Sequence, residues 1–270
     1  MKKHDDIKHN IKAHDLVYDE YEAKHGEIFN EIEQGRLHNQ LKQAIGEIKT
    51  ASTRKEALDF GCGSGNLTKH LLDLGLHVTS ADLSENFLKL IKEKFSSTGQ
   101  SETIKINGQD LSNIEDNRFD FVATYSVLHH VPDYLKIVEE MARVTKPGGI
   151  IYLDHEANDA FWNPTDEYKE FVRQAEPKQE KKLSRFLKPS TWIIKFRETI
   201  NPRYQVEGDI HVWPDDHIEW DKVEELLVKN GCETVIKEDY LLYKRGYPEK
   251  IYNDYKNKVT DVRVLVASKK

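Results

Sequence analysis

Short apolar segments alternate with helical patterns between residues 55 and 155 of the chain. The apolar segments have the length and the branched side chains of buried strands, and the segments between them repeat apolar positions at helical spacing. Strands are predicted near 55–60, 77–82, 102–107, 119–125 and 149–155. Helices are predicted near 65–75, 84–96 and 131–145. This alternation predicts β-α-β units and therefore an α/β fold built on a mostly parallel sheet.

Two further regions extend this pattern. Residues 1–50 carry apolar side chains at helical spacings near 12–24 and 28–48, and are predicted to form an N-terminal helical cap. The α/β pattern resumes with a helix near 218–230 and strands near 233–243 and 261–268.

Residues 156–217 interrupt the alternation and are predicted to form an inserted lid over the rim where a substrate would enter. This segment carries more aromatic side chains than a solvated loop needs: Phe161, Trp162, Tyr168, Phe171, Phe186, Trp192, Phe196 and Trp213. They either contact an apolar or aromatic ligand or form a small core of the lid itself. The predicted main domain is thus made of 51–155 and 218–270.

Composition narrows the class of protein. The chain has 40 Lys and Arg against 47 Asp and Glu, a formal charge of −7, which disfavours a nucleic-acid partner. No apolar run approaches the ~20 residues of a membrane span, and the start of the chain lacks the apolar core of a signal peptide. Cys62 and Cys232 lie far apart, with no Cys/His cluster for zinc. We expect a cytoplasmic protein without integral membrane association or a metal site.

A glycine-rich turn between a predicted strand and helix is the most informative segment. Gly61, Gly63 and Gly65 stand at alternate positions, so the backbone can pass close beneath a ligand where a Cβ would collide. Asn66 occupies the place of the third glycine of a dinucleotide fingerprint, and no phosphate-loop lysine follows. Asp59, two residues before the first glycine, suits a cationic ligand better than a pyrophosphate.

Two more acids follow at the ends of predicted strands. Asp82, next to Leu83, can accept both hydroxyls of a ribose, although it could instead cap the following helix. Asp110 can accept an exocyclic amine while Leu111 packs on a purine face. A ligand with adenine, ribose, an ammonium and a positive sulfur but no phosphate fits these acids. That ligand is S-adenosylmethionine.

At these residues the sequence resembles the class I S-adenosylmethionine-dependent methyltransferases. Five segments carry the likeness, in the family's order: Leu58–Gly65, Asp82, Gly108–Asp110, Tyr125–Asp133 and Lys146–Gly149. The family implies a Rossmann-like seven-stranded sheet of order 3-2-1-4-5-7-6 with the last strand antiparallel. Within it, the chain looks most similar to the small-molecule branch that includes ubiquinone and menaquinone biosynthesis methyltransferases.

Candidate catalytic residues follow from the chemistry of methyl transfer. Alignment does most of the work, and a base helps only when the acceptor must lose a proton. His129 and His130 follow the fourth strand and His155 ends the fifth, at the edge where ligands bind in open α/β sheets. Each could instead be a structural histidine. Tyr125 and Tyr18 are candidates for contact with the cofactor, with ordinary helix packing as the alternative for Tyr18.

Together these patterns predict an enzyme that transfers a methyl group from S-adenosylmethionine to O, N or C of a small organic molecule, releasing S-adenosylhomocysteine. An apolar or aromatic acceptor is favoured if the aromatic residues of the lid face it. A methyltransferase of RNA or protein and a non-catalytic S-adenosylmethionine-binding protein are the alternatives. A nicotinamide oxidoreductase is disfavoured by Asn66.

Overall fold

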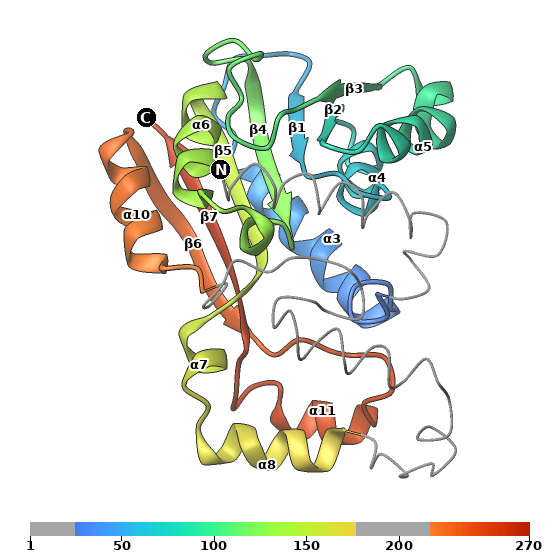
Figure 1. Ribbon diagram of the computed structural model, residues 1–270, viewed down its shortest axis with the longest axis vertical. Helices are drawn as coiled ribbons and strands as arrows, with labels where there is room; N and C mark the ends of the chain where they lie inside the picture. Colours follow the sequence, from blue (N-terminus) through green and yellow to red (C-terminus); the bar gives the residue numbers. More distant parts are fainter. Residues whose placement is uncertain (1–24, 177–216) are drawn as a thin grey trace, which may run out of the picture.

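A seven-stranded sheet forms the centre of the computed structural model, which describes residues 25–176 and 217–270 (Figure 1). The strand order is β3-β2-β1-β4-β5-β7-β6. Neighbouring strands are parallel from β3 to β5, and β7 runs antiparallel to both β5 and β6. The predicted Rossmann-like fold and its strand order are confirmed.

The elements fall close to their predicted positions. The strands are β1 Glu56–Phe60, β2 His77–Asp82, β3 Ser101–Lys105, β4 Phe119–Tyr125, β5 Thr145–Ala157, β6 Cys232–Tyr240 and β7 Val262–Lys269. The α-helices are α3 Glu31–Gly46, α4 Asn66–Asp73, α5 Glu85–Phe95, α6 Tyr134–Val144, α7 Asp159–Trp162, α8 Asp166–Ala175, α10 Trp220–Lys229 and α11 Glu249–Tyr255. Short 3₁₀ turns lie at η2 Ser96–Thr98 and η3 Leu128–His130.

Helices cover both faces of the sheet, because successive strand residues point to opposite faces. In β1, Leu58 and Phe60 belong to a core shared with α6 and α10, whereas Ala57 belongs to a second core shared with α3 and α4. The near-continuous burial of β1 and β4 is typical of parallel strands covered on both sides. The carboxyl ends of the strands are thereby left as the open edge.

Side chains cap the N-termini of α3 and α5, but not that of α4. Ser84 caps α5 by accepting from Phe87 N at 3.3 Å, so the capping role considered for Asp82 falls to Ser84. Asn30 caps α3 in the same way. At the start of α4 stands Gly65, which has no side chain to cap the helix.

β5 begins earlier than the predicted 149. Thr145 pairs with Phe119 and Ile150 pairs with Phe121, so the extra residues form a bulge that contains Gly148 at φ +79°. The predicted turn is therefore built into the strand. Its position also lets Lys146 reach the buried Asp120 of β4 at 2.8 Å.

Beyond the open edge lies a small third core, which is one of the two arrangements expected for the aromatic residues of the predicted lid. α8 packs against α11, a helix in the connection between β6 and β7 (Figure 1). Phe171 of α8 is fully buried there against Tyr247 and Tyr255. Phe171 and Tyr168 thus pack within this core, while the larger part of the predicted lid, 177–216, lies outside the described residues. The cap and lid boundaries stay predictions.

No helix within residues 25–176 and 217–270 combines the length and apolar character that a membrane-spanning segment needs.

Candidate cofactor site

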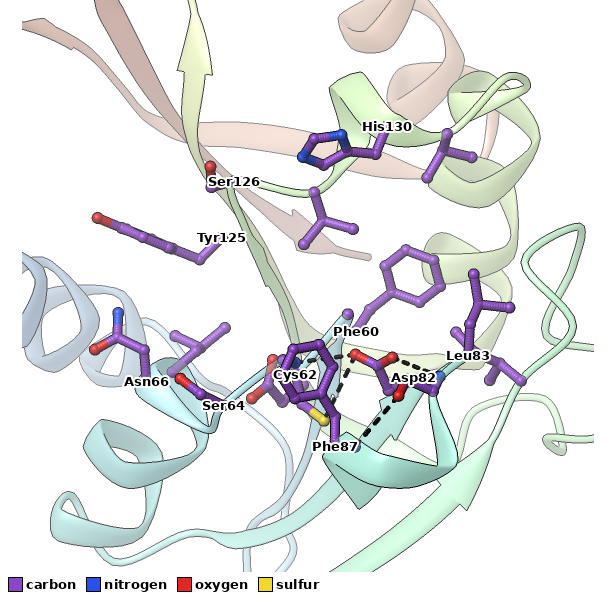
Figure 2. A pocket seen from close by; sticks show the side chains of 18 of the residues that line it. Phe60, Cys62, Ser64, Asn66, Asp82, Leu83, Phe87, Tyr125, Ser126 and His130 are labelled. Atoms are coloured by element: carbon purple, nitrogen blue, oxygen red, sulfur yellow. Dashed lines mark hydrogen bonds between the residues drawn. The ribbon is translucent and has the colours of Figure 1, made fainter. Parts of the chain in front are cut away.

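A crevice with an empty volume of about 1080 Å³, including its open mouth, lies at the carboxyl ends of β1, β2 and β4 (Figure 2). The strand order reverses between β1 and β4, which is where ligands bind in open α/β sheets. Seven of the predicted site residues line it: Asp59, Gly61, Gly63, Asp82, Leu83, Tyr125 and His130. Gly65, Asp110, Leu111, His129 and His155 do not line it, and Tyr18 lies outside the described residues.

The glycines of the turn have different tasks. A Cβ on Gly63, at φ +48°, would meet no atom of the described residues within 4 Å apart from its chain neighbours, so it would project into open space. A Cβ on Gly65, at φ +95°, would lie 2.6 Å from Ile91 Cδ1 of α5. Gly63 therefore keeps room for a ligand, while Gly65 lets two helices pack closely.

Asp82 ties the glycine turn to the start of α5. Its Oδ2 accepts from Gly63 N at 3.0 Å, and its Oδ1 accepts from Ser84 N at 2.8 Å (Figure 2). These backbone donors orient the carboxylate at the crevice wall, where it can still accept hydrogen bonds from a ligand because each oxygen has two lone pairs.

Asp59 is a buried acid with a strongly changed pKa. Its side chain is 1% exposed, and its Oδ2 accepts from Thr68 Oγ1 at 2.6 Å. Burial, assisted by the charge of Asp82, raises the pKa of Asp59 to about 7. A cationic ligand in the crevice would favour the ionised form of this acid.

The three candidate histidines do not meet. His130 lines the crevice, and the His129 ring packs against it at a centroid distance of 4.0 Å, with the ring planes tilted by 48°. His129 Nδ1 contacts Glu156 Oε2 at 2.7 Å. His155 packs on Tyr125 at 4.7 Å. Burial lowers the pKa of His155 below its usual value.

Glu156 organises the turn that carries His130, although sequence patterns did not single it out. This fully buried carboxylate accepts from Val127 N at 2.9 Å and from Leu128 N at 2.7 Å, in addition to its contact with His129. An acid inside an apolar strand was the only available signal. Its partners lie 27 to 29 residues earlier in the chain, so only the fold reveals them.

A second buried polar cluster joins α3 to the ends of β4, β5 and β6. Arg36 contacts both Glu33, at 2.5 Å, and Asp154, at 2.9 Å. Tyr125 OH donates to Glu33 Oε1 at 2.9 Å, and Tyr240 OH donates to Asp154 Oδ1 at 2.9 Å. The crevice residue Tyr125 is therefore held by the cap helix.

Asp110 and Leu111 are not among the residues that line the crevice. Asp110 Oδ1 accepts from Ser112 Oγ at 2.6 Å and from Asn107 Nδ2 at 3.0 Å, and these hydrogen bonds lower the pKa of Asp110. Leu111 is fully buried in the core. The crevice wall nearest to them is made by Ile106 and Gly108. The adenine-side roles of Asp110 and Leu111 remain predictions.

Residues 58–153, which contain the glycine turn, Asp82 and His130, match a family described as a methyltransferase domain. Residues 58–153 therefore form a methyltransferase domain. The match places this domain on the strands that build the crevice.

Relatives of this chain have quinone-biosynthesis names. A demethylmenaquinone methyltransferase of Bacillus licheniformis is 28% identical over 63% of this chain and 74% of the relative. A ubiquinone biosynthesis O-methyltransferase of Dechloromonas aromatica is 35% identical over 50% of this chain and 60% of the relative. The chain thus spans between about three fifths and three quarters of these two proteins.

A solved structure supports the fold. An S-adenosylmethionine-dependent methyltransferase from Methanosarcina mazei superposes with a TM-score of 0.51 and 23% identity, covering 81% of this chain and 93% of that one. At this identity the likeness concerns the arrangement of strands and helices.

Proposed function

We propose that this methyltransferase transfers the methyl group of S-adenosylmethionine to O, N or C of a small organic acceptor. The observation that carries the proposal is the crevice itself, where open space above Gly63 meets the carboxylates of Asp59 and Asp82. These two acids suit a ligand that is cationic and free of phosphate.

The crevice residues fit such a donor. Asp82 would accept the ribose hydroxyls, as its oxygens already accept N–H groups from two loops. Asp59 would face the ammonium group. Leu83 and Ile106 supply an apolar wall for the adenine ring, beside Gly108. When bound, the donor supplies a methyl group on a positive sulfur.

His130 is the histidine best placed to take a proton from an acceptor. It lies on the crevice wall, and the turn that carries it is fixed by Glu156 through Val127 N and Leu128 N. His129 packs behind it and would act as a positioning residue. For an acceptor carbon or nitrogen that needs no base, alignment alone would suffice.

An aromatic acceptor of the phenol or quinol type fits the remaining wall. Ile28, Phe29, Val131 and Pro132 line the crevice with apolar surface. The quinone-related names of the relatives point in the same direction. Both cysteines are buried and free, which suits a reducing compartment, and we propose the cytoplasm.

Titration calorimetry combined with a methyl-transfer assay tests the proposal. We expect S-adenosylhomocysteine to bind, NADH not to bind, and label from S-adenosylmethionine to pass to a phenol or quinol in an acceptor panel. Binding without transfer to any acceptor would favour a non-catalytic binding protein. Salt-sensitive transfer to RNA would favour the RNA methyltransferase alternative, and failure of both ligands to bind would refute the proposal.

A further inference from the structure

Asn66, at the start of α4, lines the crevice and has one of its two amide atoms held by a hydrogen bond from the protein. Gln34 Nε2, from α3, donates to Asn66 Oδ1 at 2.9 Å and to Ile28 O at 3.0 Å. A backbone carbonyl only accepts, so Ile28 fixes which end of the Gln34 amide faces Asn66. Asn66 must therefore accept the hydrogen bond from Gln34 through its side-chain oxygen. Its Nδ2 is left buried with no hydrogen-bond partner in residues 25–176 and 217–270.

The other end of the Gln34 amide contacts His70, which in turn contacts His38. His70 Nε2 lies 2.8 Å from Gln34 Oε1, and because this oxygen accepts, the His70 nitrogen must donate. Burial lowers the pKa of His70 to about 4, so the ring is neutral near pH 7 and its Nδ1 can accept from His38 Nδ1 at 3.3 Å. Each donor in this relay points toward Asn66, which leaves the Asn66 amide a single orientation.

Ser64 presents a second polar atom on the same wall. Its side chain is 4% exposed, it lines the crevice, and its Oγ has no partner among the described residues. Figure 2 shows Ser64 and Asn66 next to each other below Tyr125. Buried polar atoms without partners are rare and costly, so two of them on one crevice wall indicate a ligand that accepts hydrogen bonds.

Positive charge lies close to Ser64 and Asn66, in addition to the acids Asp59 and Asp82 of the same crevice. Lys94 Nζ donates to Ser64 O at 3.0 Å, which brings a positive charge to the turn. Gly65 leaves the first turn of α4 without a side-chain cap, and a helix N-terminus carries partial positive charge. The donor proposed above has one anionic group, the α-carboxylate of its methionyl end.

We propose that Ser64 Oγ and Asn66 Nδ2 bind this α-carboxylate, and that Gln34 and the two histidines are positioning residues that aim the Asn66 donor at it. The inference rests on the proposed function. The ammonium group would then lie toward Asp59, so that the two charges of the amino-acid end are recognised by separate residues. His38, in α3, links this recognition to the cap helix.

Two ligands that differ only in the carboxylate can test its contribution to binding. S-adenosylhomocysteine carries it, while its decarboxylated analogue, with a 3-aminopropyl chain on sulfur, keeps the amine and lacks the carboxylate. We expect the wild-type chain to bind S-adenosylhomocysteine roughly 10- to 100-fold more tightly than the analogue, measured by calorimetry. The Asn66→Asp variant, which opposes one carboxylate to another, should lose this preference entirely.

Variants of the relay test the positioning role. Gln34→Met removes both donated hydrogen bonds and should weaken S-adenosylhomocysteine about 5- to 10-fold, with less than about a twofold change for the analogue. Gln40→Met is the matched control, because Gln40 lies on the same helix and donates to Glu238 at 2.6 Å, outside the crevice lining. This variant should bind both ligands as the wild type does.

The outcomes separate the two proposals. If the wild type binds neither ligand, the proposed function fails and the carboxylate site with it. If the wild type binds both ligands equally, or Gln34→Met and Asn66→Asp weaken both alike, the carboxylate site is wrong while the proposed function stands. Should those variants fail to fold, Ser64→Ala, which removes one oxygen atom, and the wild-type preference decide the question.

Discussion

At the amino ends of β1 and β4, the buried Asp120 has a donor for each oxygen, whereas at the carboxyl ends of the same strands Ser64 and Asn66 keep polar atoms that find no hydrogen-bond partner within residues 25–176 and 217–270. Asp120 accepts from Thr50 Oγ1, from Glu56 N at 2.9 Å and from Lys146 Nζ at 2.8 Å. Both edges bury polar groups. Satisfied groups stabilise the fold, and unsatisfied ones mark the edge that binds a ligand.

Lys269, at the amino edge, likewise has its polar group fully hydrogen-bonded. This last residue of β7 donates to Asn117 Oδ1 at 2.9 Å and to the carbonyls of Ala142 and Thr145, each at 2.8 Å. Burial lowers the pKa of Lys269, yet its protons are all used. Substitutions at this edge should therefore change stability, and substitutions at the crevice should change binding.

The largest effect is expected from Asp82→Ala. Loss of the carboxylate removes the proposed acceptor of both ribose hydroxyls, so the Kd for S-adenosylhomocysteine should rise roughly 100- to 1000-fold by calorimetry. Leu83→Ala, one residue away, is a milder control that keeps the acid. An Asp82→Ala variant with wild-type affinity would remove the ribose role.

Asp120→Ala, at the amino edge, should change stability and not cofactor binding. It leaves the Lys146 ammonium without its carboxylate partner and the Glu56 N–H without its acceptor, which should cost about 3 kcal/mol of unfolding free energy in urea. Cofactor affinity of the folded variant should stay within about twofold of wild type. Arg54→Ala, which breaks an exposed ion pair with Glu56, should cost less than about 0.5 kcal/mol.

Asp120 also gives a pH test of its edge. Burial alone would raise its pKa, but hydrogen bonds from Lys146 and Thr50 outweigh burial and hold the pKa at about 2, below the usual 3.8. The stability it contributes is therefore present above about pH 4 and is lost as the pH falls through 2. The Asp120→Asn variant should lack this part of the acid transition in a urea titration at several pH values.

His130→Ala should lower kcat roughly 10- to 100-fold for an acceptor that must lose a proton, with cofactor affinity unchanged within about twofold. His129→Ala should have a smaller effect, because His129 contacts Glu156 and packs against His130 without lining the crevice. Equal losses in both variants at every pH would indicate a structural role for the pair.

The smallest effect is expected from pH acting through Asp59. A cationic ligand binds the ionised acid, so affinity for S-adenosylmethionine should fall about tenfold between pH 8 and 6, across the pKa of about 7. The Asp59→Asn variant should show no such slope. Without ligand the raised pKa acts oppositely: the folded chain holds this proton more tightly than the unfolded one, so unfolding free energy declines as pH rises from about 4 to 7.

The sheet could be predicted from sequence because its signals are local. Strand periodicity, the glycine turn and the Lys146–Gly149 turn each lie within a few residues, and all of the predicted strands are present. Asp59, Gly63 and Asp82 reach the crevice because strand ends share one edge of a parallel sheet.

The remaining site residues depend on neighbours far apart in the chain. Gln34 meets Asn66 across 32 residues, and Glu33 meets Tyr125 across 92. A buried glutamate or glutamine gives no local sign of its partner. α11 was missed for a related reason: its seven residues carry too little periodicity, and only burial against α8 makes them a helix.

The attachment of α3 has a consequence for the order of folding. This helix is the first described one along the chain, yet its bonds reach Asp154 of β5 and Glu238 of β6, 118 and 198 residues later. During synthesis on the ribosome, α3 cannot form these bonds with β5 and β6 until most of the polypeptide has been made. The binding edge is thus completed only after the final strands have emerged, so a truncated nascent chain would have no finished pocket for a nucleoside.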